Sequence, residues 1–305
     1  MQRQAEMDGS EDGKRPGVEI PTGTVASRTY WQTVRVRLSR DPVTIVCASI
    51  LLLIILVAIF APFLAPKDPE AGSVFKRLAK IGSPGYPLGA DELGRDMLSR
   101  LIYGGRVSLF MGIAPVAGAV LIGGTLGIVA GFIGGKTNMV IMRVMDVFYA
   151  FPSVLLAIAI SGAMGPGPVN SLIALTLILI PPIARVAESV TTQVRSFDFV
   201  EAARASGAKT GSIIREHVLS NVLGPIFIYA TSLISFSIIV ASGLSFLGLG
   251  VAPPVADWGL MLSTLRQSIW VNPYVAALPG VMIFIASLCF NLVSDGLRSA
   301  MDVRM

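Results

Sequence analysis

The sequence predicts an all-α membrane protein with six transmembrane helices. Of its 305 residues, 53% are hydrophobic and 14% are charged, and the mean hydropathy is +0.72. Because a soluble domain carries roughly 25% charged residues, this composition excludes an ordinary cytosolic enzyme. A helix needs roughly 20 mainly apolar residues to cross a bilayer, and runs of this kind recur six times along the chain.

Each of the six runs is almost free of charged residues. We expect the spans at residues 43–64, 107–133, 144–163 and 169–186, within 222–249, and at 274–293. Pro62 and Pro66 mark the exit of the first run, Pro152 should kink the third, and Pro181-Pro182 lie near the end of the fourth. Glycine and other small residues in the second and fifth runs permit close contacts between helices.

The residues before the first run predict a cytoplasmic tail, residues 1–42. Residues 1–27 are rich in glycine, proline and charge and lack periodicity, which is typical of disorder. Residues 30–40, with Trp31 and several arginines, predict a short helix at the inner membrane surface. The first run is not a cleaved signal peptide, because it has full membrane length and no small-residue cleavage site follows it.

The basic residues predict the orientation. With both termini in the cytoplasm, 16 of the 24 Lys and Arg residues fall inside and 8 outside, as the positive-inside rule requires. These basic residues are scattered over loops without an aromatic-studded basic face, so we expect contact with membrane lipid and not with nucleic acid. The predicted divisions are the 1–42 tail, a first transmembrane helix at 43–65, an external loop domain at 66–106, a five-helix core at 107–298 and a cytoplasmic tail at 299–305.

The polar segment 195–222 lies between two apolar runs and predicts a helix–turn–helix on the water side. Glu201, Ala202 and Ala203 suit a compact helix, and Gly207 can adopt the left-handed conformation that ends it. His217 lies on a stripe of helical spacing that follows. A rigid helical segment outside the lipid suits a membrane subunit whose conformation is changed by contact with a soluble partner.

This segment resembles the EAA loop of the membrane subunits of ABC importers. Glu201, Ala202, Ala203 and Gly207 match that pattern in identity and spacing. The later part is similar to the His-Ile-Leu-Pro-Asn of peptide permeases, with Ser220 in place of the proline. Residues 87–96, 99–104 and 291–298 resemble segments of dipeptide and oligopeptide permease C-type subunits, so the resemblance covers residues 41–305.

The resemblance implies the type I permease fold of ABC importers and a place in the bacterial cytoplasmic (inner) membrane. It implies a second homologous permease subunit, two cytoplasmic ATPase subunits that bind ATP and Mg, and an extracytoplasmic substrate-binding protein. The coupling loop would then comprise Glu201, Ala202, Ala203, Gly207 and His217, and His217 is expected to pack or hydrogen-bond in the second short helix rather than to act as a pH switch. No cofactor is expected in this chain itself.

Two further groups are candidates with open alternatives. Ser232, Ser235 and Ser242 on the fifth run either line a polar path or hydrogen-bond between helices. Asp257 and Trp258, on the predicted external side, either form a docking surface for the binding protein or, for the tryptophan, an interfacial anchor.

No energy source is evident in the sequence. It contains no P-loop, and its single histidine, His217, cannot build a metal or catalytic site alone. Asp146 and Asp295 lie near cytoplasmic span ends and are expected to cap or to pair with Arg143 and Arg298. Cys47 and Cys289 are expected to be buried small hydrophobes.

The predicted function is therefore that of a non-catalytic permease subunit of an ATP-driven importer of di- or oligopeptides. Nickel or another small solute is the alternative within the class. An ion-coupled secondary transporter is the alternative outside it, although such a protein needs ionisable groups near the bilayer midplane.

Overall fold

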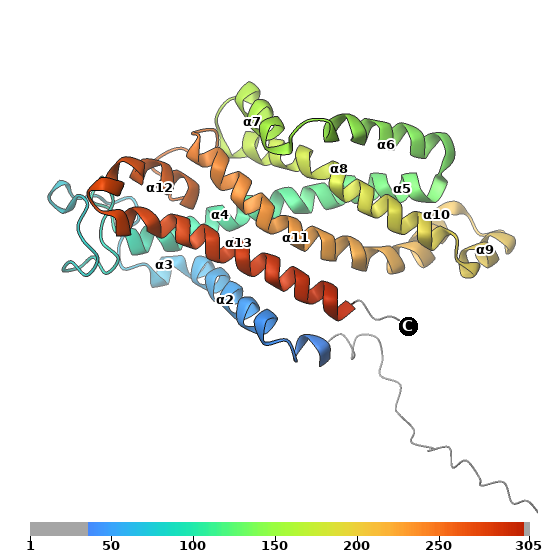
Figure 1. The fold of residues 1–305 in the computed structure, drawn as a ribbon, viewed down its shortest axis with the longest axis horizontal. Helices are drawn as coiled ribbons and strands as arrows, with labels where there is room; N and C mark the ends of the chain where they lie inside the picture. The colour runs from blue at the N-terminus through green and yellow to red at the C-terminus, as the bar shows by residue number, and fades with distance from the viewer. Residues whose placement is uncertain (1–35, 302–305) are drawn as a thin grey trace, which may run out of the picture.

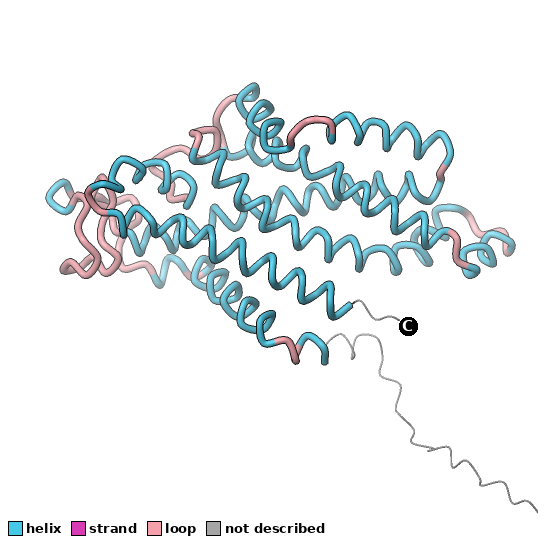
Figure 2. The backbone as a smooth tube through the Cα atoms, viewed as in Figure 1, coloured by secondary structure: helices cyan, strands magenta, loops and turns pink. Residues whose placement is uncertain are grey.

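The computed structural model describes residues 36–301, and within that range it is an elongated helical bundle without strands (Figures 1 and 2). Residues 1–35 of the predicted tail, with most of the helix expected at 30–40, lie outside the described residues, and residues 36–38 are helical. Residues 302–305 also lie outside them. The all-α membrane fold is confirmed.

Five described helices are long and apolar enough to cross a membrane, or six if one bent pair is counted as a single span. The elements, in order, are α2 (Pro42–Ile59), α3 (Ala61–Leu64), η1 (Val74–Lys76), α4 (Met97–Ala119), η2 (Val120–Gly124), α5 (Thr125–Ile133), α6 (Gly135–Tyr149), α7 (Ser153–Met164), α8 (Pro168–Arg195), α9 (Asp198–Ala205), α10 (Thr210–Ile213), η3 (Ile214–Val218), α11 (Leu219–Phe246), α12 (Trp258–Thr264), η4 (Leu265–Trp270) and α13 (Pro273–Met301).

The third predicted span is a bent pair and not one kinked helix. α6 ends at Tyr149, α7 begins at Ser153, and their axes meet at 86°. Pro152 stands immediately before α7 with ψ 119°, outside the helical region. Proline lacks the N–H that would continue α6 and disfavours helical backbone in the residue before it, so the chain breaks here.

The second span begins earlier than expected, at Met97 rather than at residue 107. Asp96 caps this helix, because its Oδ2 accepts from the Ser99 backbone N–H at 2.8 Å and from Ser99 Oγ at 2.7 Å. The prediction placed the start too late because Arg100 and Arg106 interrupt the apolar run. The helix nevertheless includes Arg100, since this side chain is 2% exposed and packs inside the protein.

Three other spans extend beyond the predicted limits. The fourth continues to Arg195, so that Pro181 and Pro182 lie in its interior and not near its end. The fifth is continuous with the helical segment before it over Thr210–Phe246, and the sixth runs over Pro273–Met301. An apolar run marks only the part of a helix that lies in lipid, which explains why polar turns at both ends were not included.

A stripe of glycines brings α5 and the preceding η2 against α8. A Cβ at Gly123 would lie 2.6 Å from the Ile180 carbonyl oxygen, and one at Gly131 would lie 2.6 Å from that of Glu188. At Gly127, between them, a Cβ would collide with the Ala184 carbonyl oxygen. Spacing of four residues places the three glycines on one helix face, so the two backbones approach closely, as in other membrane bundles.

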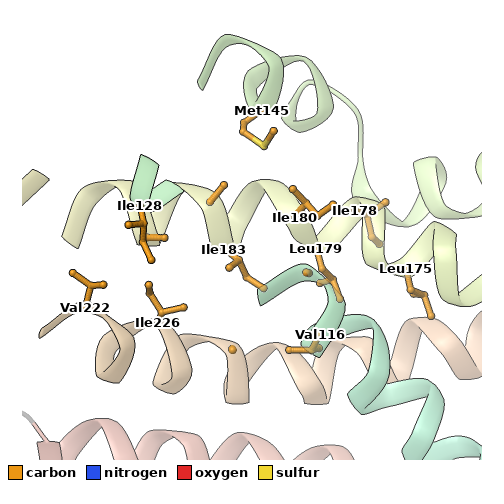
Figure 3. Close-up of a cluster of buried hydrophobic side chains, with 14 of the residues drawn as sticks. Val116, Ile128, Met145, Leu175, Ile178, Leu179, Ile180, Ile183, Val222 and Ile226 are labelled. Atoms are coloured by element: carbon orange, nitrogen blue, oxygen red, sulfur yellow. The ribbon is translucent and has the colours of Figure 1, made fainter. Parts of the chain in front are cut away.

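The main core fills the space between α4, α5, α8 and α11 (Figure 3). Leu175, Leu179 and Ile183 project from α8 and Val222 and Ile226 from α11, each 1% exposed or less. α8 also contacts α6 and α7 on its other side, so one helix connects the core to the bent pair.

The loops gather at the two ends of the bundle (Figure 1). α9 and α10 lie at one end, toward which the start of α2 and the end of α13 also point. The opposite end holds α12 and the segment between α3 and α4. There, Asp91 Oδ2 lies 2.6 Å from Arg95 Nε and 3.3 Å from Arg100 Nε, and all three side chains are buried.

We predict that Gly127→Ala destabilises the bundle. The added methyl group overpacks the contact with α8, and overpacking typically costs about 1–3 kcal/mol. Thermal unfolding of the purified chain in detergent should show a lower midpoint. Gly124→Ala is the matched control, since its Cβ would meet nothing within 4 Å and replacing a helical glycine stabilises by roughly 0.5–1 kcal/mol. Equal midpoints for the two variants would contradict the close α5–α8 contact.

Candidate functional site

The predicted helix–turn–helix is formed by α9, a tight turn and α10. Gly207 has φ +79° and donates its N–H to the Arg204 carbonyl at 2.9 Å, while the Ala208 N–H bonds the Ala203 carbonyl at 3.1 Å. These two bonds form a Schellman motif, which requires the left-handed residue at this position. Glycine adopts this conformation without steric cost, so the sequence ends α9 where the motif predicts.

One face of α9 is packed and the other is free. Val200 is fully buried, and Ala203 packs against the main core. The Arg204 guanidinium lies 5.1 Å from the ring centre of Phe132 at the end of α5, a cation–π distance. Glu201 and Ala202 are exposed. The helix is therefore anchored to the bundle while it presents an acidic and small-residue surface outward.

His217 packs beside this helix. Its ring centre lies 6.3 Å from that of Phe199, with the planes tilted by 53°. Its carbonyl oxygen accepts from Asn221 Nδ2 at 2.6 Å. The helix continues through Ser220 into α11 without a break, which a proline at this position would disfavour. The geometry matches the packing interpretation of His217.

Two exposed aromatic rings in this loop were not predicted from the sequence. Phe197 and Phe199 are 43% and 40% exposed, and their ring centres lie 5.8 Å apart in an edge-to-face arrangement. They stand just before Glu201, so rings, carboxylate and alanine form one surface at the end of the bundle. A Phe-x-Phe pair in an otherwise polar segment is the sequence pattern that could have indicated this exposed aromatic surface.

The three candidate serines of α11 hydrogen-bond or pack within the bundle. Ser232 Oγ donates to the Tyr229 carbonyl at 2.7 Å, and Ser235 Oγ donates to the Ser232 carbonyl at 2.8 Å, both within their own helix. Ser242 is 8% exposed, and its backbone lies against Gly259. These contacts favour a role in helix packing.

The expectation of an exposed docking surface at Asp257 and Trp258 is wrong, because the two residues are 3% and 0% exposed. Asp257 caps α12: Oδ2 accepts from the Leu260 N–H at 3.0 Å, and Oδ1 accepts from Ser108 Oγ at 2.6 Å. Trp258 Nε1 donates to the Leu101 carbonyl at 2.9 Å. Both residues join α12 to α4, and polar groups with such partners are stable when buried.

Asp146 also has a different partner from the one expected. It forms an ion pair with Arg185 of α8 and not with Arg143 of its own helix. The Arg185 guanidinium lies 4.8 Å from the ring centre of Tyr149. Beside this group is a pocket of about 200 Å³ between α6, α7, α8 and α11. Sequence reasoning missed this cluster because its members come from helices whose pairing the sequence does not specify.

In residues 36–301 no three His, Cys, Asp or Glu side chains are grouped to hold a metal ion. Cys47 and Cys289 are free and buried in one apolar cluster with Leu51, as expected for small hydrophobic residues.

Comparison with known proteins is consistent along almost the whole chain. Residues 123–305 match the family model of the binding-protein-dependent transport system inner membrane component, and residues 29–80 match the N-terminal transmembrane domain of oligopeptide transport permease C. The chain is 40% identical over 290 residues to the dipeptide transport system permease protein DppC of Alkalihalophilus pseudofirmus, covering 95% of each chain.

Two other similarities agree with this. The glutathione transport system permease protein GsiD of Pectobacterium atrosepticum is 39% identical over 278 residues, covering 91% of this chain and 92% of that protein. An inward-facing structure of the MetNI methionine ABC transporter aligns with TM-score 0.56 at 18% identity, over 67% of this chain and 97% of the other. The last similarity shows the fold alone. Together these findings establish that the chain belongs to the family of inner-membrane permease components of ABC transport systems, in its dipeptide and oligopeptide permease C group.

Proposed function

We propose that this chain is the permease subunit of an ATP-driven peptide importer and that α9 transmits the action of an ATPase subunit to the membrane helices. The observation that carries the proposal is the exposed, glycine-terminated helix with Glu201 and Ala202 outward at one end of the bundle. Relatives named for transport of dipeptides, D,D-dipeptides and glutathione support a peptide as the solute.

The expected partners follow from family membership. A second permease subunit, two ATPase subunits that hold ATP and Mg, and a substrate-binding protein outside the membrane complete the importer. ATP hydrolysis then takes place in the partner subunits and not in this chain. The end of the bundle that carries α9 and both described termini faces the cytoplasm, and the end with α12 faces outward, in agreement with the basic-residue count.

The connections of α9 suit mechanical coupling. Only Ser196 and Phe197 separate it from α8, and the segment Thr210–Phe246 runs as one helix from the far side of the turn into the membrane. A displacement of α9 therefore acts on two spans through short, hydrogen-bonded connections. The exposed rings of Phe197 and Phe199 supply apolar contact area for an ATPase partner.

We predict that Gly207→Val uncouples the importer. Left-handed backbone costs an L-residue about 1–2 kcal/mol, and a β-branched side chain is among the worst at positive φ, so α9 would be misaimed. Peptide uptake by cells should fall several-fold while the amount of membrane-inserted protein stays the same. Gly207→Asn is the matched control, since asparagine tolerates this conformation, and it should keep most of the uptake. Normal uptake by the valine variant would contradict the coupling role of the turn.

We predict that Lys209 is cytoplasmic and Lys80 external. Both side chains are exposed, so a cysteine at either position is open to an impermeant thiol reagent. With Cys47 and Cys289 replaced by alanine, Lys80→Cys should be labelled in intact cells, and Lys209→Cys should be labelled only after the membrane is permeabilised. The reverse pattern would invert the proposed orientation.

The function is tested by reconstitution in liposomes. The chain together with its partner permease, ATPase subunits and loaded binding protein should hydrolyse ATP and accumulate labelled dipeptide, whereas the chain alone should do neither. Accumulation by the lone chain under a proton or sodium gradient would instead identify a secondary transporter. Accumulation of nickel but not of peptide by the complete importer would reject the proposed solute.

A further inference from the structure

A half-exposed ion pair lies on the membrane-spanning part of the protein. Asp146 Oδ1 contacts Arg185 Nη2, and the two side chains are 41% and 48% exposed. Arg185 belongs to α8, one of the candidate spans, and Asp146 to the bent pair α6–α7. Charged groups are costly next to lipid and, in membrane proteins, generally face a water-filled cavity or the interior of an assembly.

An aromatic pocket lies next to the ion pair. Of its lining residues, the rings are contributed by Phe148, Tyr149, Phe151, Tyr229 and Phe236. Tyr149 belongs to both features, because its ring also lies 4.8 Å from the Arg185 guanidinium. Along the two helices, Asp146 is about one turn from Tyr149, and Arg185 is about one turn from Pro181, another lining residue.

The combined site therefore has an apolar wall and a rim with both signs of charge. Short peptides have the complementary chemistry, because they carry one ammonium group, one carboxylate and apolar side chains. A guanidinium binds a carboxylate through two parallel hydrogen bonds, a carboxylate binds the ammonium group, and aromatic faces accept side chains or a cation. The volume of about 200 Å³ is below the roughly 300–1,000 Å³ of pockets for drug-sized ligands, which favours di- and tripeptides.

The mutual pairing of Asp146 and Arg185 also limits how tightly a peptide binds. A peptide that enters exchanges one ion pair for two, so most of the electrostatic gain offsets the pair that is broken. Transport needs a site that is favourable enough to enter and weak enough to leave, as in conducting pores.

We propose that the Asp146–Arg185 pair and the adjoining aromatic pocket form a transit site for zwitterionic di- and tripeptides, with Asp146 binding the amino terminus and Arg185 the carboxyl terminus. The proposal rests on the peptide-importer function above. The competing explanation is that the pair only fastens α6 to α8.

The test measures protection of a cysteine in the pocket. Ser153→Cys is a nearly isosteric change at an exposed position in the pocket lining, introduced with Cys47 and Cys289 replaced by alanine. The complete importer is reconstituted without binding protein, so that the selectivity of that protein does not enter the result. If the affinity is near 1 mM, 10 mM alanyl-phenylalanine should slow labelling by a thiol reagent about tenfold.

Ala159→Cys is the matched control, since it is exposed on the same helix but does not line the pocket, and its labelling should not respond to peptide. Alanyl-phenylalanine blocked at both termini should give no protection at Ser153→Cys. Absence of protection by the free dipeptide, or equal protection by the doubly blocked one, would overturn the transit site.

Charge variants separate recognition from fastening. In the Ser153→Cys background, Asp146→Asn should abolish the weaker protection by the dipeptide amide, which keeps only the ammonium group. Arg185→Gln should abolish the protection by the N-acetyl dipeptide, which keeps only the carboxylate. A merely structural pair would instead show the same change for both half-blocked peptides.

Dipeptide transport by the unaltered importer with its loaded binding protein is measured in parallel: transport without protection rejects the transit site alone, and no transport rejects both proposals.

Discussion

The close contact between α5 and α8 determines where the other functional elements lie. Because Gly123, Gly127 and Gly131 bring no side chains to this contact, α8 lies directly on the backbone of its neighbour. The same helix contacts α4 and α11 in the core and α6 and α7 outside it, and it leads into α9 after two residues. The α9–α10 turn and the pocket thus share one rigid support, and a shift of α8 would displace both.

The sequence was sufficient for the fold class and for the end of α9. Hydropathy reports the cost of placing side chains in lipid, so it located the spans, and Gly207 indicated a left-handed turn that few other residues tolerate. It could not give the sharp break at Pro152, because a proline kinks or ends a helix according to the surrounding packing. The partner of Asp146 was wrong for a related reason: Arg143 is near in sequence, but only the tertiary arrangement brings Arg185 to it.

The two ends of the bundle are built differently. At the α12 end, Asp91, Arg95 and Asp257 are buried, and each has hydrogen-bonding or charged partners that favour one arrangement of these side chains. Trp258 closes this end by packing into the space left by Gly104 and Gly105. At the α9 end, Phe197 and Phe199 remain exposed. Apolar side chains are exposed at both ends, since Trp270 and Phe75 at the α12 end are 91% and 97% exposed, so the α12 end differs by its buried polar contacts.

The bent pair is held less firmly than the rest of the bundle. Met145 is the only buried residue of α6, and two polar contacts join this helix to α8: Asn138 Nδ2 donates to Glu188 Oε1 at 2.6 Å, and Asp146 pairs with Arg185. Half-exposed polar contacts contribute little to stability, and water or a solute can replace them, which is not true of the interdigitated α5–α8 contact. An applied force would therefore separate α6 from α8 before it separated α5 from α8. The charged groups that such a separation exposes lie beside the aromatic pocket, so this contact combines weak polar attachment with chemistry suited to a peptide.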